Sequence, residues 1–163
     1  PGYAAAWEAA LGPMLPRQRP GVVVMRDYHA ENVMLLGSLE KQGLLDFQDA
    51  LVGHAAYDLV SLLQDARRDV APALEAEMFD YYVRQTGVGD DFLADYARLG
   101  AQRHAKIVGI FVRLWKRDGK PRYLDYIPRV WALLERDLAH PALEPVARWF
   151  DAYLPTEELA PAL

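Results

Sequence analysis

The sequence predicts a mainly helical α+β protein in which a small β-structure precedes a series of helices. Up to Gly53 the apolar residues form short runs between turn-forming residues, which is typical of short strands. After Gly53 they recur at spacings of three and four, the period of an amphipathic helix. The 163 residues are 52% hydrophobic and 25% charged, a composition typical of one globular domain with its own apolar core.

The N-terminal part predicts one helix and three strands. Trp7, Leu11 and Leu15 share a helical face, so residues 2–15 are expected to form a helix that ends at Pro16. A hairpin is expected to join the second and third strands, because the segment between them is long enough for a loop. The three apolar runs expected to be strands, the first of them buried, are residues 22–25, 33–36 and 44–47.

The remainder of the chain predicts helices alone. Pro72 suits the first turn of one of them, and Gly87 follows its last residue as a helix stop. The expected helices are residues 58–68, 72–86, 90–116, 122–138 and 141–153. The tryptophans on helical stripes are expected in the core: Trp7, Trp115, Trp131 and Trp149.

Composition argues against several classes of protein. The formal net charge of -5 argues against a general nucleic-acid binder, which is usually basic. The absence of cysteine excludes disulfides and thiolate zinc sites. No apolar run is long enough to span a bilayer, and no basic-then-apolar signal segment opens the sequence. We therefore expect no nucleic-acid partner, no membrane association and a cytoplasmic location.

A polar cluster between Asp27 and Asn32 interrupts the apolar residues from Val22 to Leu36. Such a cluster is costly unless its polar groups find partners. One interpretation is a solvated turn between two strands, and the other is a loop that holds a catalytic base and a metal ligand. Asp46 follows two leucines on the far side of the predicted hairpin, so we expect Asp27, Asn32 and Asp46 to converge at one end of a small sheet.

Phosphoryl transfer from ATP requires this set of side chains. An asparagine amide oxygen and an aspartate are hard oxygen ligands that suit Mg²⁺, so Asn32 and Asp46 are the expected metal ligands. Asp27 is the expected catalytic base, which accepts a hydrogen bond from the attacking hydroxyl. The protein-kinase pattern H-R-D-x-x-x-x-N followed by D-F-G has this form. Here Met25 replaces its histidine and Gln48 its final glycine.

Three sequence blocks in order, RDYHAEN, LLDFQDA and GHAAYDLVSLL, resemble the aminoglycoside phosphotransferase and choline kinase family. Within it the chain looks most like the bacterial N-acetylmuramate/N-acetylglucosamine kinases, which phosphorylate an anomeric hydroxyl. The resemblance implies the C-terminal, mostly helical lobe of a protein-kinase-like fold over residues 1–163. It also implies ATP and Mg²⁺ as cofactors, a small-molecule hydroxyl acceptor and a place in peptidoglycan recycling.

Three further residues are candidates for the site. His29 is a candidate contact to substrate, or alternatively a brace for the loop. Arg103 is a candidate contact to an anionic sugar substituent, or alternatively part of a solvated helix face. Asp58 stands at the start of a helix, where a carboxylate caps backbone N–H groups, and the resemblance implies that it also supports the loop.

The sequence shows neither a glycine-rich phosphate loop nor a strand lysine before Val22, both of which the N-terminal lobe of such a kinase carries. We therefore expect that lobe to be absent from this chain, and the 163 residues alone to fold without kinase activity. An apolar surface near Val24, Leu45 and the first helix is expected to favour self-association. The alternatives are an aminoglycoside or choline-type kinase, a non-catalytic kinase-like binding module and a metal-dependent hydrolase.

Overall fold

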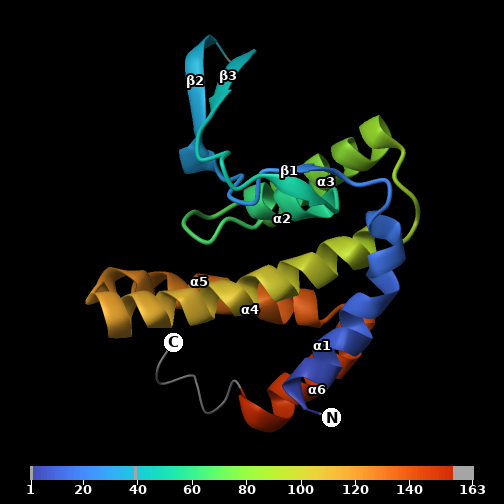
Figure 1. Cartoon of the computed structure of the whole chain (residues 1–163), viewed down its shortest axis with the longest axis vertical. Coiled ribbons are helices and arrows are strands. Elements are labelled where there is room, and N and C mark those ends of the chain that lie inside the picture. The colour runs from blue at the N-terminus through green and yellow to red at the C-terminus, as the bar shows by residue number, and fades with distance from the viewer. Residues whose placement is uncertain (1, 39, 156–163) are drawn as a thin grey trace. The chain divides into compact units, whose positions relative to one another are not determined.

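The computed structural model describes residues 2–38 and 40–155 (Figure 1). Its elements are mostly helices, with two small antiparallel sheets, which confirms the predicted α+β class. The chain divides into two compact units, which are described separately. One unit is Pro16–Phe92, and the other joins the N-terminal helix to the segment from Leu93 onward.

The four strands of the first unit form two separate two-stranded sheets rather than one. Strand β1 (Val22–Val24) pairs with β4 (Leu51–Gly53), and β2 (Val33–Ser38) pairs with β3 (Lys41–Leu44). The hairpin of β2 and β3 was predicted. The strand expected at residues 44–47 is wrong, because β3 ends at Leu44 and contains no other residue of that range. The register pairs Leu44 with Val33, so the polar residues before Leu44 form the strand.

These strands expose most of their apolar side chains. Val24 is buried, whereas Val23 is 70% exposed and Val52 on the paired strand is 73% exposed. The prediction of a buried first strand therefore holds for Val24 alone. A two-stranded ribbon has two faces, and within this unit only one of them is covered.

Two helices complete this unit. Helix α2 (Ala56–Leu63) ends earlier than predicted, and α3 (Pro72–Thr86) has the predicted bounds. Gly87 adopts the left-handed conformation, φ 64°, and its N–H donates to the carbonyl of Val83 at 2.9 Å. This is the geometry in which a glycine ends a helix at little cost.

The other unit is built from helices and short 3₁₀ segments. Helix α1 (Tyr3–Leu11) continues as a 3₁₀ helix (Gly12–Gln18), so the expected α-helix over 2–15 is shorter than predicted and Pro16 lies inside the 3₁₀ turn. Helix α1 lies along α6 (Figure 1). The remaining elements are α4 (Phe92–Asp118), a 3₁₀ helix (Pro121–Tyr126), α5 (Ile127–Leu138), a 3₁₀ helix (Pro141–Leu143) and α6 (Glu144–Tyr153).

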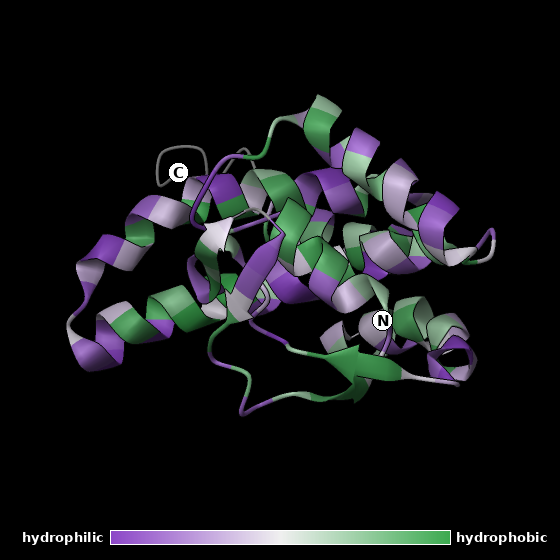
Figure 2. Cartoon of the chain, turned by 90° about the horizontal axis from the view of Figure 1, so that it is seen from above, coloured by the Kyte–Doolittle hydropathy of each residue, from purple (hydrophilic) through white to green (hydrophobic). Residues whose placement is uncertain are grey.

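The apolar core of this unit lies among α1, α4, α5 and α6. Hydrophobic and hydrophilic residues alternate along the helices (Figure 2). Trp149 packs against this core, but Trp115 is 38% exposed, so its predicted burial is wrong. The buried members are Ala6, Trp7, Ala10, Ala97, Ala101, Trp131, Leu134, Leu143, Val146 and Phe150.

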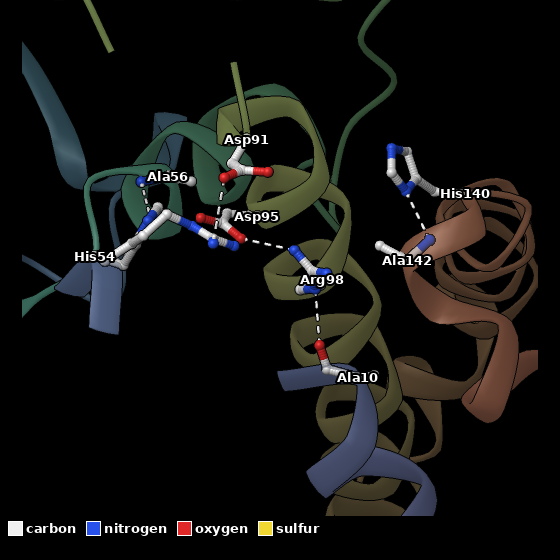
Figure 3. A network of polar contacts seen from close by, with 9 residues as sticks. Ala10, His54, Ala56, Asp91, Asp95, Arg98, His140 and Ala142 are labelled. Carbon is white, nitrogen blue, oxygen red and sulfur yellow. Dashed lines mark hydrogen bonds and ion pairs between the residues drawn. The ribbon is translucent and has the colours of Figure 1, made fainter. Parts of the chain in front are cut away.

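Two pairs of buried polar side chains connect helices of this unit. Arg98 donates to Asp95 at 2.9 Å and to the carbonyl of Ala10 at 2.7 Å, which ties α4 to α1 (Figure 3). His104 and Asp137, both buried, lie 3.0 Å apart and connect α4 to α5. Such pairs offset the cost of removing polar groups from water. Across residues 2–38 and 40–155, no helix is long and apolar enough to cross a membrane.

Candidate active site

The loop that follows β1 is attached to α2 through the carboxylate of Asp58. The backbone N–H groups of Met25 and Arg26 donate to its two oxygens at 2.6 and 3.0 Å. Arg26 has φ 70°, in the left-handed region, which a residue with a side chain adopts only when surrounding bonds hold it. One carboxylate therefore satisfies two backbone donors and sets the chain direction at the residue before Asp27.

The start of α2 is capped by a different residue from the one that the sequence suggested. Nδ1 of the buried His54 accepts from the N–H of Ala56 at 3.2 Å (Figure 3). Asp58 directs its oxygens toward the loop, and its charge also reaches α3. Burial first, and the negative charge of Asp58 second, raise the pKa of Tyr82 above its usual value.

Asn32 is oriented by hydrogen bonds within the loop. Its side-chain nitrogen donates to the carbonyl of Asp27 at 2.9 Å and lies 3.3 Å from Nε2 of His29. The backbone N–H of Asn32 donates to the carbonyl of His29 at 2.9 Å. An amide group has two hydrogens and one acceptor oxygen, so these contacts direct both hydrogens into the loop and leave Oδ1 as the atom available to a cation.

His29 lies inside the loop rather than on its surface. Its side chain is 5% exposed, and its Nε2 lies 3.3 Å from the side-chain nitrogen of Asn32. Of the two interpretations offered by the sequence, this geometry favours the loop brace over the substrate contact.

Asp46 is held beside the loop by its neighbour in the chain. The N–H of Leu45 donates to the carbonyl of Asn32 at 2.9 Å, so the end of β3 is bonded to the end of the loop. Asp46 follows at φ 58°, a left-handed conformation that aspartate tolerates better than most residues. The backbones of Asn32 and Asp46 are therefore brought close together as expected, although Asp46 lies in a bend two residues after β3 and not at the end of a strand.

Two further side-chain contacts involve the loop and the turn after it. Gln48, treated as a departure from a glycine, donates its side-chain N–H to Oδ1 of Asp46. Arg67 Nε lies 3.4 Å from an oxygen of Glu31, which joins the turn after α2 to the loop. The left-handed conformation of Arg26 and the Arg67–Glu31 pair depend on contacts between distant parts of the chain, so local sequence patterns carry no signal for them.

The candidate residue Arg103 is not part of this loop unit. It lies in α4, in the other unit, and its side chain is buried. Its proposed contact with an anionic sugar substituent stays a prediction.

No group of three or more histidine, aspartate or glutamate side chains within the described residues is arranged to hold a metal ion by itself. The predicted ligands Asn32 and Asp46 would therefore leave the other positions of a bound cation to ligand or water oxygens. That arrangement is typical of Mg²⁺, which keeps several waters and binds through one or two protein oxygens together with phosphates.

The Asp58→Asn variant is expected to lower the free energy of unfolding by about 2–3 kcal/mol, because an asparagine offers one acceptor oxygen and no charge to two backbone donors. Urea unfolding measures this change, and amide hydrogen exchange should show faster exchange at Met25 and Arg26. Asp80→Asn, an exposed aspartate on α3, is the matched control and should change stability little. Equal effects of the two variants would contradict the anchoring role.

Comparison with known proteins agrees with these features. The model of the phosphotransferase enzyme family matches residues 2–101, a stretch that contains the whole loop and both sheets. An N-acetylmuramate/N-acetylglucosamine kinase of Caulobacter vibrioides is 46% identical over 160 residues, covering 94% of this chain and 44% of the relative. The enzyme of the same name from Pseudomonas aeruginosa is 42% identical over 130 residues, covering 75% of this chain and 38% of that relative.

A third protein of that name, from Neisseria meningitidis, is 38% identical over 140 residues, covering 80% of this chain and 41% of its own length. The chain thus spans less than half the length of each of these relatives. The resemblance stated from the three sequence blocks is confirmed by both kinds of comparison. The chain belongs to the phosphotransferase enzyme family.

Proposed function

We propose that the protein containing this chain is an ATP-dependent kinase that phosphorylates the anomeric hydroxyl of an N-acetylated amino sugar. The observation that carries the proposal is the bonded unit formed by the Asp27–Asn32 loop and Leu45. It supports a base, an amide oxygen and a carboxylate within one small region. The names of the relatives support the choice of an amino sugar as the acceptor.

The donor set near the loop suits a magnesium ion. Asn32 would contribute Oδ1, which its two amide donors orient, and Asp46 would contribute its carboxylate. When bound, the ion would neutralise phosphate charge and orient the phosphates. The chain's own contribution is to hold these two oxygens at fixed positions and to present Asp27 to the acceptor.

Asp27 is proposed as the base. Its backbone carbonyl accepts from His29 N–H at 3.0 Å and from the side chain of Asn32, so the main chain at this residue is fixed while the carboxylate remains on a half-buried surface. A carboxylate on a fixed main chain can accept the hydrogen bond of an attacking hydroxyl and its proton as the bond to phosphorus forms. An anomeric hydroxyl is more acidic than an ordinary alcohol, so a base of this modest strength suffices.

The same proposal extends to the place of the chain in the protein. Its residues would form the mainly helical lobe of a two-lobed kinase-like fold, and the three sequence blocks support this assignment. Self-association of the chain by itself also stays a prediction. The exposed apolar side chains of Val23, Val52 and Leu45 support it, whereas Val24, which was expected at that surface, is buried.

An acceptor panel tests the function directly. Full-length protein supplied with ATP and Mg²⁺ is expected to phosphorylate N-acetylglucosamine and N-acetylmuramate, and phosphorus NMR should show a sugar 1-phosphate. Reactions without an acceptor control for simple ATP hydrolysis, which separates a kinase from a hydrolase. Turnover of kanamycin or choline with none on either amino sugar would reassign the acceptor, and no transfer to any acceptor would favour a binding module.

A further inference from the structure

A cluster of basic side chains surrounds the C-terminal end of α4, outside the loop that carries the proposed chemistry. Within residues 113–122 there are five basic residues and one acidic residue, in a chain whose net charge is -5. The cluster, called the cationic turn below, consists of Arg113, Lys116, Arg117, Lys120 and Arg122. All five residues are exposed.

The backbone of the cationic turn is well defined. Gly119 adopts φ 64° and its N–H donates to the carbonyl of Trp115 at 3.1 Å, while the N–H of Lys120 donates to the carbonyl of Leu114 at 3.1 Å. These paired bonds end the helix and direct the chain into the next 3₁₀ segment. The basic side chains on either side of Gly119 therefore project from a fixed scaffold.

The 3₁₀ segment is anchored by aromatic packing on α4. Phe111, which is buried, contacts the rings of Tyr123 and Tyr126 at centroid distances of 5.4 and 5.8 Å. This packing holds the chain after Lys120 against the helix, so both sides of the turn belong to one surface of this unit.

The single acidic residue is insufficient to neutralise the cationic turn. Asp118 accepts two hydrogen bonds from Arg117, at 2.6 and 3.0 Å. The Arg117 hydrogen bond first, and then the charges of Arg117, Lys120 and Arg113, hold the pKa of Asp118 below its usual value. In the part of the chain that the structure describes, Arg113, Lys116 and Lys120 form no ion pair with a carboxylate.

The helix dipole explains only part of this charge. Lys116 and Arg117 lie in the last turn, where cations interact favourably with the helix C-terminus. Arg113 lies a turn earlier, and Lys120 and Arg122 lie beyond the helix end, where that interaction has faded. A different reason is needed for these three.

Aromatic faces accompany the cations. The Nζ of Lys116 lies 4.0 Å from the ring centroid of Trp115, which is 38% exposed, and Arg122 lies 5.2 Å from the ring of Tyr123. A partly exposed aromatic ring offers an apolar surface to the C–H groups of a sugar, and neighbouring arginine and lysine side chains bind carboxylate or phosphate oxygens. This combination of aromatic and basic side chains suits a ligand that has both a sugar ring and a carboxylate or phosphate group.

We propose that the cationic turn binds a small sugar that carries an oxyanion, either a carboxylate or a phosphate. The net charge of -5 opposes binding of an extended polyanion such as nucleic acid or an anionic membrane, whereas a small ligand meets mainly the local field of the turn. The site uses residues of a different unit from the loop, and the proposal requires no catalysis.

Titration of the purified chain tests this site. The probes are N-acetylglucosamine 1-phosphate, N-acetylmuramate, neutral N-acetylglucosamine and inorganic phosphate, and the readout is the indole N–H signal of Trp115 in NMR spectra, assigned with Trp115→Phe. One or both anionic sugars should shift this signal with millimolar or tighter affinity. The neutral sugar should bind at least about tenfold more weakly, and higher ionic strength should lower the affinity for the anionic ligands. The stronger anionic sugar identifies phosphate or carboxylate as the preferred group.

Charge variants localise the binding. Lys120→Gln combined with Arg122→Gln should lower the affinity for the anionic sugar roughly tenfold or more. The control, Arg19→Gln combined with Arg84→Gln, removes the same charge at exposed positions elsewhere and should leave this affinity unchanged. The proposal is overturned if no anionic sugar shifts Trp115, if the neutral sugar binds equally well, or if both double variants weaken binding alike. Because the readout is binding at Trp115, its failure is distinguishable from a failure of the kinase assignment.

Discussion

Replacing Asp27 by asparagine in the full-length protein is expected to lower phosphoryl transfer to an amino sugar on the order of 1000-fold. The backbone of Asp27 is held by the N–H of His29 and the side chain of Asn32, and neither contact uses its carboxylate. The variant is therefore expected to keep the shape and contacts of the loop and to lose only the proposed base. The measurement is the initial rate of sugar phosphate formation, together with the dissociation constant of ATP in the presence of Mg²⁺.

The expected pattern is a large fall in kcat with nucleotide affinity nearly unchanged. Asp90→Asn is the matched control, because it removes the same charge from an exposed position in the unit Pro16–Phe92, which also contains Asp27. This variant should retain normal turnover. Urea unfolding of both variants shows whether the loss comes from misfolding. Near-normal turnover of Asp27→Asn would mean that a different residue acts as the base.

Replacing Asp46 by alanine is expected to remove most of the Mg²⁺-dependent affinity for ATP, roughly 100-fold or more, which corresponds to about 2.7 kcal/mol. Asp46 is the proposed carboxylate ligand, and the bond from Leu45 to Asn32 holds it beside the proposed amide ligand. Loss of the carboxylate leaves a neutral amide, which binds a divalent cation weakly. Titration of ATP with Mg²⁺ and with a chelator present separates the metal-dependent part of binding.

Two further variants make this measurement specific. Asp46→Asn keeps a side chain that tolerates the left-handed backbone at φ 58°, so it separates the loss of charge from backbone strain. Asp49→Ala removes an exposed carboxylate three residues further along the same turn and should leave Mg²⁺ dependence intact. If Asp49→Ala abolishes the dependence and Asp46→Ala does not, the metal ligand has been assigned to the wrong aspartate.

Much of this protein follows from local sequence. The bounds of α3 are determined by Pro72 and Gly87, because a fixed φ suits the first helical turn and a left-handed residue ends the last one. The sequence alone also suggested the residues of the candidate site, since Asp27, Asn32 and Asp46 offer the oxygen donors of phosphoryl transfer in the right order. Such features depend on residue type and spacing over a few positions.

Tertiary contacts decided the rest. The partner of β1 is β4, and β3 begins at Lys41 rather than at Leu44, because strand register depends on pairing across the sheet and not on apolar content alone. The bonds from Met25 and Arg26 to Asp58 join residues more than thirty positions apart and hold Arg26 in a left-handed conformation. A local pattern places a carboxylate at the start of a helix, but only the folded chain determines which backbone groups it reaches.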